Sequence, residues 1–213
     1  MSLPAAIARI ALALIVMGPG TGEKQATARD VSAVLRDRND DGTIVVLCFG
    51  DSITKGTFFG AYPWKLRTLL NGATVVNEGI YGETSVRGRR RLPAVLDKVR
   101  PDYVVLIEGI NDCCTVEDVE SNLSAMVEGI RRRGAVPLVG TLYVSPKRER
   151  GVPARCARQV NHHIRKLPVG LVDLDRVIRH RWDAFTIDGI HPNMQGYALI
   201  AETVAAALAA DPR

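Results

Sequence analysis

Five short segments of this sequence are apolar along almost their whole length, and longer segments with helical spacing separate them. The apolar segments are rich in β-branched residues, which is typical of buried strands. They cover residues 43–49, 73–77, 102–108, 135–140 and 170–173. The segments with helical spacing cover residues 62–70, 89–99, 116–132, 154–167 and 194–209. This alternation predicts a fold in which strands and helices take turns along the chain.

A strand that is apolar on both faces needs cover on both faces, and right-handed crossover helices provide it. We therefore expect a three-layer α/β/α sandwich around a central parallel sheet of about five strands. In such sheets the functional groups gather in the loops after the carboxyl ends of the strands. The chain has 213 residues, 46% of them hydrophobic, and fits a single domain. We place this domain at residues 29–213.

The N-terminal region has the pattern of a targeting segment. Residues 10–17 form an apolar run behind Arg9, a Gly-Pro-Gly breaker ends it, and residues 26–28 (ATA) form a small-x-small cleavage pattern. This predicts a signal peptide over residues 1–28 of a secreted or periplasmic protein, the alternative being an N-terminal extension of a cytoplasmic one. The run is too short to cross a bilayer of roughly 30 Å, so we expect no stable membrane span.

The four cysteines differ in their surroundings. Cys48 lies in an apolar segment, which predicts a buried thiol. Cys113, Cys114 and Cys156 fall in loops or at a helix start, and the loops with Cys114 and Cys156 follow neighbouring strands. A disulfide from Cys113 or Cys114 to Cys156 fits this arrangement in an oxidising compartment, and free thiols are the alternative.

Three polar motifs follow the first three predicted strands. Ser52 lies in GDSIT where the first strand ends, Gly82 lies in NEGIYGET after the second, and Asn111 lies in GIND after the third. A glycine lets a backbone N–H approach a ligand, and an amide side chain donates hydrogen bonds without a titrating proton, so both could bind an oxyanion. Taken one at a time, a turn, a glycine needed for backbone geometry or a helix cap would explain each motif.

A fourth motif, DGIHPN, stands just before the last helix. Asp188 precedes His191 by three residues on a loop held by glycine and proline. Such a carboxylate can accept a hydrogen bond from Nδ1–H of the ring while Nε2 faces a serine. The other histidines, His162, His163 and His180, lack a motif of this kind and are expected to be ordinary surface residues.

The four motifs, in this order, resemble the signature of the SGNH hydrolase family of GDSL-like lipases, acylhydrolases and esterases. The matching residues are Ser52, Gly82, Asn111 and His191, with Asp188, and isoleucine replaces the leucine of the GDSL name. The likeness runs from about residue 43 to the final helix. It implies a flavodoxin-like sandwich and ester hydrolysis without a metal or an organic cofactor.

In the mechanism that this resemblance implies, His191 takes the proton of Ser52 as the serine attacks an ester carbonyl, and Asp188 orients the ring. The N–H groups of Ser52 and Gly82 and the side chain of Asn111 would bind the oxyanion. An acyl-Ser52 intermediate would then react with water. Four other carboxylates near strand ends compete with Asp188 for its role but lack its spacing to the histidine: Asp51, Asp112, Asp173 and Asp175.

Basic residues give the chain a formal net charge of +5, from 28 Lys and Arg against 23 Asp and Glu. This is small for a nucleic-acid-binding protein of this length, so we expect no nucleic-acid partner. Several basic residues lie in or beside the loops at the carboxyl edge and either rim the cleft for an anionic ester or are solvated surface charge. They are Lys55, Arg87, Arg89, Arg90, Lys147 and Arg148, with Arg91 and Arg150 beside them. Arg131, Arg132 and Arg133 end a helix and are expected to be structural.

Two other functions stay open at this point. An acyltransferase would use the same three residues but pass the acyl group to an alcohol. A non-catalytic α/β module would bind anionic ligands with its basic loops, although the sequence has no phosphate-binding G-x-x-x-x-G-K-[ST] loop. The expected partner is a small-molecule, carbohydrate or lipid ester.

Overall fold

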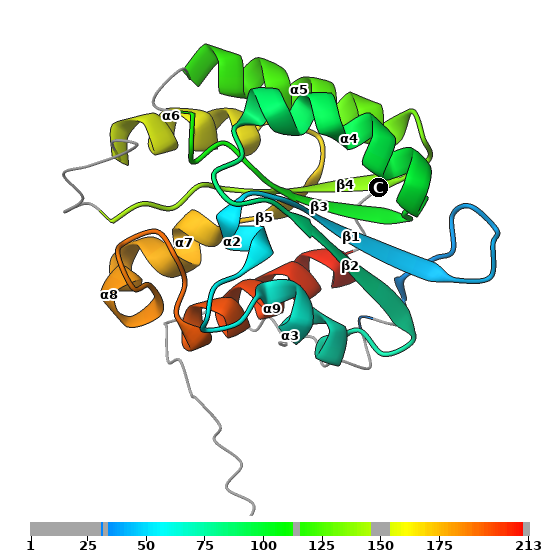
Figure 1. The fold of residues 1–213 in the computed structure, drawn as a ribbon, viewed down its shortest axis with the longest axis horizontal. Coiled ribbons are helices and arrows are strands. Elements are labelled where there is room, and N and C mark those ends of the chain that lie inside the picture. Colours follow the sequence, from blue (N-terminus) through cyan, green and yellow to red (C-terminus); the bar gives the residue numbers. More distant parts are fainter. Residues whose placement is uncertain (1–30, 32–33, 113–115, 146–153, 211–213) are drawn as a thin grey trace, which may run out of the picture.

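A five-stranded parallel sheet forms the centre of the protein (Figure 1). The structure is a computed structural model that describes residues 31, 34–112, 116–145 and 154–210. The strands are β1 (Ile44–Gly50), β2 (Ala73–Gly79), β3 (Tyr103–Ile107), β4 (Val136–Gly140) and β5 (Gly170–Val172), in the order β2-β1-β3-β4-β5. All four neighbouring pairs are parallel.

Helices cover both faces of the sheet (Figure 1). On one face lie α4 (Ser85–Val99), α5 (Val116–Arg131) and α6 (Ala154–Ile164). On the other lie α3 (Tyr62–Leu69), α7 (Leu174–Ile178), α8 (Trp182–Phe185) and α9 (Met194–Ala209). The short α2 (Ser52–Lys55) follows β1, and a 3₁₀ turn, η1 (Arg179–Arg181), joins α7 to α8. The predicted three-layer α/β/α sandwich is therefore confirmed.

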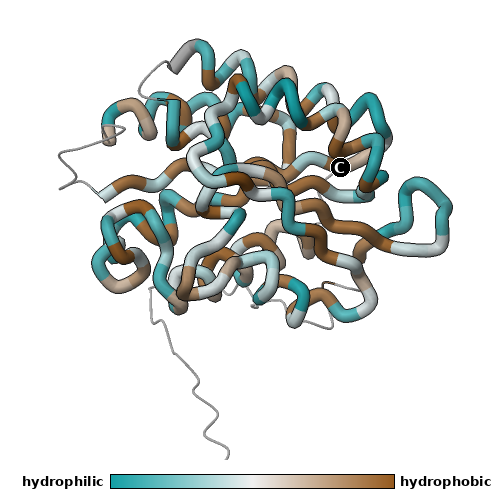
Figure 2. Tube along the Cα trace, in the orientation of Figure 1, coloured by the Kyte–Doolittle hydropathy of each residue, from teal (hydrophilic) through white to brown (hydrophobic). Residues whose placement is uncertain are grey.

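The core forms where the central strands meet the helices. Every residue of β3 and β4 is buried, which is why these strands are apolar without alternation. The helices contribute one apolar side each, such as Leu92, Val95 and Leu96 of α4. Figure 2 shows hydrophobic residues along the strands and hydrophilic ones over the outer turns of the helices.

Most predicted bounds agree with the structure within one or two residues, and α9 agrees at both ends. The largest difference is at α4, which begins at Ser85 and not at residue 89. The carboxylate of Asp112, from the loop after β3, accepts hydrogen bonds from the Ser85 N–H (2.9 and 3.1 Å) and from its hydroxyl (2.6 Å). The Ser85 N–H, at the start of α4, thus finds its acceptor in a residue that is distant in the sequence. The helix predicted over residues 154–167 corresponds to α6, which ends three residues earlier, at Ile164.

All five strands end at one edge of the sheet because they are parallel. Within the described ranges, no helix has the length and apolar character needed to cross a membrane. The predicted signal peptide lies outside the described residues.

Candidate active site

The end of β1 places Ser52 at the carboxyl edge. A Cβ on Gly50 would lie 1.9 Å from the carbonyl oxygen of Ile107, so only glycine lets β1 pass β3 this closely as it turns into α2. Ser52 is the first residue of α2, and the side chain of Asp51 caps the helix by accepting a hydrogen bond of 2.8 Å from the Ile53 N–H. The Ser52 N–H therefore stands at a helix start, where no intrahelical acceptor is available.

A hydrogen-bonded chain joins Ser52, His191 and Asp188. Ser52 Oγ lies 3.1 Å from His191 Nε2, and His191 Nδ1 lies 2.9 Å from Asp188 Oδ2. When Nδ1 carries the ring proton and its N–H donates a hydrogen bond to the carboxylate, Nε2 can accept the proton of the serine hydroxyl. The side chains of His191 and Asp188 are 36% and 45% exposed, so water reaches both.

Asp188 also shapes its own loop. Its Oδ1 accepts hydrogen bonds from the backbone N–H groups of Ile190 (3.0 Å) and His191 (2.8 Å). Partial burial alone would raise the pKa of Asp188, but the backbone and ring N–H groups of His191 and the Ile190 N–H lower this pKa to about 2. The carboxylate is therefore ionised at neutral pH beside the imidazole.

Contacts outside the DGIHPN segment hold this loop in place. Thr186 and Pro192 form an isolated antiparallel bridge, and the Ser145 N–H donates to the Gly189 carbonyl at 2.9 Å. Asn193 then caps α9 by accepting a hydrogen bond of 2.9 Å from the Gly196 N–H. The cap and the bridge fix the loop on both sides of His191.

Gly82 and Asn111 meet at one turn of the same edge. Gly82 has a φ of +65°, and the Asn111 side chain donates to the carbonyl of the next residue, Glu83, at 2.9 Å. The loop is tied to the segment of Ser52, because the Ile80 N–H donates to the Gly50 carbonyl at 2.9 Å. The three loops after β1, β2 and β3 therefore form one structure.

A family comparison agrees with this arrangement. The model of the GDSL-like Lipase/Acylhydrolase family matches residues 48–199. The chain belongs to this family. It is an ester-cleaving enzyme of the GDSL-like type, and the predicted family resemblance is confirmed.

Similar proteins include two curated enzymes and many solved structures. An arylesterase of Vibrio mimicus is 29% identical over 175 residues, which are 75% of this chain and 86% of the relative. The thioesterase 1/protease 1/lysophospholipase L1 of Escherichia coli K12 is 27% identical over 178 residues, 75% of this chain and 81% of the relative. A lipase/acylhydrolase structure from Enterococcus faecalis has a TM-score of 0.70 at 23% identity and covers 80% of this chain and 98% of its own, which shows the shared fold.

The other predicted carboxylates of this GDSL-like enzyme have separate partners. Asp51 caps α2 and Asp112 holds the first turn of α4. Asp173 and Asp175 accept hydrogen bonds from Arg165 at 2.6 and 3.0 Å. Each of the four thus has a structural contact of its own, whereas Asp188 contacts the ring of His191.

The predicted basic rim is only partly described. Lys55, Arg87, Arg89 and Arg90 are exposed, and Lys147 and Arg148 lie outside the described residues. Arg91 does not belong to such a rim, because its guanidinium turns inward to Glu83 and Glu78. The sequence correctly placed Arg91 in the helix that became α4, but it did not predict the inward direction of the side chain. A role of the other four in binding an anionic ester stays a prediction.

The cysteine predictions have mixed outcomes. Cys48 is a buried free thiol, and burial raises its pKa to about 12. Cys156 is disulfide-bonded. Cys113 and Cys114 lie outside the described residues, so the choice between them as partner stays a prediction.

Large exposed apolar side chains lie close in sequence to members of the site in this GDSL-like enzyme, and the sequence analysis did not predict them. We call them the apolar rim: Phe58, Phe59, Tyr81, Ile187 and Met194, which are 100%, 44%, 61%, 53% and 59% exposed. Phe58 and Phe59 follow Ser52 by six and seven positions, and the other three lie within three positions of Gly82, Asp188 or His191. Phe58 and Phe59 pack edge to face at 5.8 Å on a turn closed by a Thr57–Gly60 bridge. The segment TFFG, an apolar pair between two turn residues, is the sequence signal from which exposed apolar side chains at this turn could have been predicted.

Four buried carboxylates lie behind the site: Asp51, Glu83, Glu108 and Asp112. Burial, and then the charges of Glu83 and Asp112, raise the pKa of Asp51 to about 7, although the Ile53 N–H opposes the shift. Burial and then the charges of Asp51, Glu83 and Asp112 raise the pKa of Glu108 well above its ordinary value. This group of buried carboxylates therefore carries less negative charge at neutral pH than four ionised carboxylates would.

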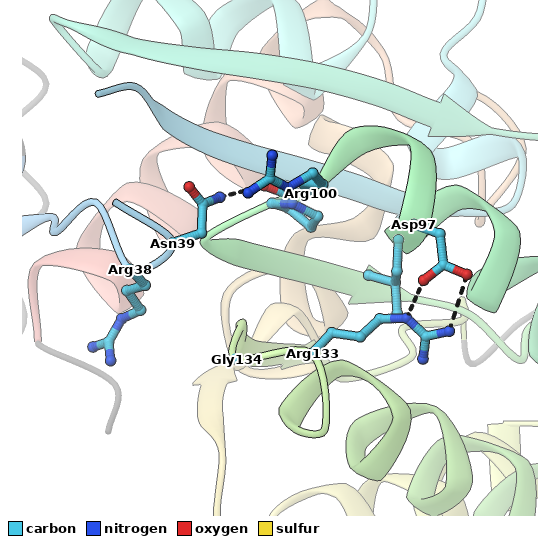
Figure 3. Close-up of a pocket in the computed structure, with 8 residues that line it drawn as sticks. Arg38, Asn39, Asp97, Arg100, Arg133 and Gly134 are labelled. Atoms are coloured by element: carbon cyan, nitrogen blue, oxygen red, sulfur yellow. Dashed lines mark hydrogen bonds and ion pairs between the residues drawn. The ribbon is translucent and has the colours of Figure 1, made fainter. Parts of the chain in front are cut away.

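A pocket of about 310 Å³ lies at the other edge of the sheet (Figure 3). Its lining includes Pro101 and Gly134, which precede β3 and β4, so it opens at the amino ends of the strands. Figure 3 shows an ion pair between Asp97 and Arg133 beside it, with a distance of 2.6 Å from Arg133 Nε to Asp97 Oδ1. This pocket is separate from the site around Ser52.

Proposed function

We propose that this GDSL-like enzyme is a serine esterase that cleaves carboxylic esters through an acyl-Ser52 intermediate. The observation that carries the proposal is the chain of contacts from Ser52 Oγ through His191 to Asp188, with distances of 3.1 and 2.9 Å. His191 Nε2 accepts the serine proton as Oγ attacks the carbonyl carbon, and the imidazolium that forms is stabilised by Asp188.

The tetrahedral oxyanion needs donors, and three groups at this edge are suited to supply them. They are the Ser52 N–H at the start of α2, the Gly82 N–H at its left-handed turn, and the amide of Asn111. Removing one such donor commonly lowers the rate by about 10²- to 10³-fold. Collapse of the intermediate expels the alcohol, which takes the proton from His191, and leaves the acyl group on Ser52.

Water completes the cycle. His191 accepts a proton from a water molecule, which attacks the acyl-Ser52 carbonyl, and the carboxylic acid leaves as the serine recovers its proton. The exposure of the His191 and Asp188 side chains, 36% and 45%, favours hydrolysis over acyl transfer because water reaches the base freely. Product analysis with an added alcohol tests this choice, since dominant transfer at millimolar alcohol would contradict it.

The surroundings of the site support esters with an apolar acyl or alcohol group. The apolar rim offers side chains that an apolar group of the substrate can partly remove from water. The arylesterase and thioesterase/lysophospholipase relatives carry names of enzymes that act on such molecules, which fits this substrate class.

The test compares hydrolysis of p-nitrophenyl esters from acetate to dodecanoate by the full chain and by Ser52→Ala and His191→Ala. Each variant should lose roughly 10⁴-fold or more of kcat, as removal of a member of such a triad commonly does. A fluorophosphonate should label the parent and not Ser52→Ala. Equal rates in the parent and Ser52→Ala would show that Ser52 is not the nucleophile.

The chain contains a matched control pair. Ser124 Oγ lies 3.0 Å from His163 Nε2, nearly the same distance as in the candidate site. Ser124 is in the interior of α5, where backbone N–H groups already donate within the helix and cannot bind an oxyanion. Ser124→Ala and His163→Ala should therefore keep the parent rate, although they remove the same residue types from a similar contact.

A further inference from the structure

Glu83 is a buried carboxylate beside a predicted oxyanion donor. Its side chain is 2% exposed, and the residue directly follows Gly82. The side chain receives two hydrogen bonds from Arg91 of α4, with 3.0 Å from Nε to Oε1 and 2.5 Å from Nη2 to Oε2. Two parallel bonds of this kind fix the direction of the carboxylate as well as its distance.

Arg91 is itself held by two strands of the sheet. Its Nη2 donates to the Glu78 carbonyl at 2.9 Å, and its Nη1 lies 3.4 Å from Glu78 Oε2. The guanidinium carbon lies 3.9 Å from the centre of the Phe49 ring, which is the last side chain of β1 before Gly50. Arg91 therefore connects the ends of β1 and β2 to the turn that carries Gly82.

The backbone of Glu83 connects the turn to the second predicted side-chain donor. Its carbonyl accepts the hydrogen bond of 2.9 Å from Asn111 Nδ2, and its N–H donates to the Ile80 carbonyl at 3.3 Å. A shift of Glu83 would thus move the Gly82 N–H and release the Asn111 amide together. One residue governs the direction of two predicted donors.

Charge explains why this pair cannot be lost without movement. Burial, and then the charge of Glu83 among others, raises the pKa values of two other buried carboxylates, Asp51 and Glu108, so Glu83 lies close to both. A buried carboxylate without its cation is costly, so without Arg91 the side chain of Glu83 would turn toward water. Turning toward water would carry the Gly82 turn with it.

We propose that Glu83 and Arg91 are positioning residues whose ion pair holds the Gly82 turn and the Asn111 amide in place for the oxyanion. The inference rests on the proposed function and adds two residues to it. Neither residue contacts the reacting atoms. Both act through Gly82 and Asn111, so their loss should reduce stabilisation of the transition state and leave ground-state binding of the ester nearly unchanged.

The experiment measures kcat and KM for p-nitrophenyl acetate with Glu83→Gln, Glu83→Asp and Arg91→Lys. Glu83→Gln removes the charge at constant size, and the other two keep the charge but spoil the two-bond geometry. Each variant should lose about 10- to 10³-fold in kcat, with KM within about threefold of the parent, because donor placement acts in the transition state. The amount of Ser52 that a fluorophosphonate labels at completion measures the number of folded active sites. Each rate is therefore divided by this number.

The Asp97–Arg133 pair at the opposite edge of the sheet is the matched control. Asp97→Asn removes an Arg–carboxylate pair with two similar bonds, 2.6 and 3.3 Å, and should leave kcat unchanged. A parent-like kcat in Glu83→Gln and Arg91→Lys, or a loss confined to KM, would overturn the positioning role. Activity in Ser52→Ala would instead refute the proposed function, so the two failures are distinguishable.

Discussion

Ser52 Oγ lies 3.1 Å from His191 Nε2, although 139 positions of sequence separate the two residues. The contact depends on the strand order, because β1 lies inside the sheet and the loop before α9 returns to the carboxyl end of that strand. Asp188 reaches His191 in a different way, through a spacing of three residues. The candidate site thus combines one long-range contact with one local contact.

Asp188→Asn should keep the fold and lower kcat by about 10⁴-fold. The amide can still accept the backbone bonds from Ile190 and His191, but it cannot hold the ring tautomer and stabilise an imidazolium as a carboxylate does. The measurement is steady-state hydrolysis of p-nitrophenyl acetate. Asp183→Asn, at an exposed carboxylate of α8 that accepts a hydrogen bond of 3.0 Å from the adjacent Ala184 N–H, serves as control and should retain the parent rate. A loss of less than tenfold in the kcat of Asp188→Asn would show that another group orients the His191 ring.

Gly82→Ala should affect both stability and catalysis, whereas Gly134→Ala should affect stability alone. The two glycines have similar left-handed φ values, +65° and +79°, and a Cβ on either would meet no heavy atom within 4 Å. Backbone strain alone therefore costs each variant about 1–2 kcal/mol, which urea unfolding would measure. Alanine keeps the backbone N–H, but strain at a left-handed φ should change the direction of that N–H. Only Gly82 is a proposed oxyanion donor, so only Gly82→Ala should lose about 10- to 10³-fold in kcat. Equal kcat values in the two variants would argue against the Gly82 N–H as a donor.

Glu108→Gln should become more stable relative to the parent as the pH rises from 5 to 8. Burial and then the charges of Asp51, Glu83 and Asp112 raise the pKa of Glu108 well above its ordinary value in the folded chain. The folded chain therefore holds a proton that the unfolded chain releases, so the parent loses stability as the pH rises above the unfolded pKa toward the folded one.

The neutral glutamine has no proton to release, so the difference in the free energy of unfolding should grow by roughly 1 kcal/mol per pH unit over that window. Urea unfolding at pH 5, 6, 7 and 8 measures it. Glu128→Gln, at a side chain that is 72% exposed, should show no such trend. A constant difference between Glu108→Gln and the parent would mean that Glu108 is ionised in the folded state.

Local signals in the sequence were enough for the order of the five strands and of the five longer helices, α3, α4, α5, α6 and α9. The strands are apolar over their whole length, and α9 has its own cap in Asn193, so its bounds are readable without neighbours. The start of α4 was missed because a distant residue, Asp112, provides the partner of the Ser85 N–H. The four-residue α2 was missed because a helix of one turn has no periodicity to read.

Patterns within short segments were enough to predict the three-layer fold, the family and the spacing of Asp188 and His191. The inward turn of Arg91 to Glu83 and the burial of Glu108 among carboxylates became known only from the folded chain. The contact of Ser52 with His191 was predicted from the family resemblance alone, and the folded chain gives its distance, 3.1 Å. These relationships depend on which segments the sheet brings together. Burial and ion pairing are properties of the neighbours in space, and a linear pattern does not contain them.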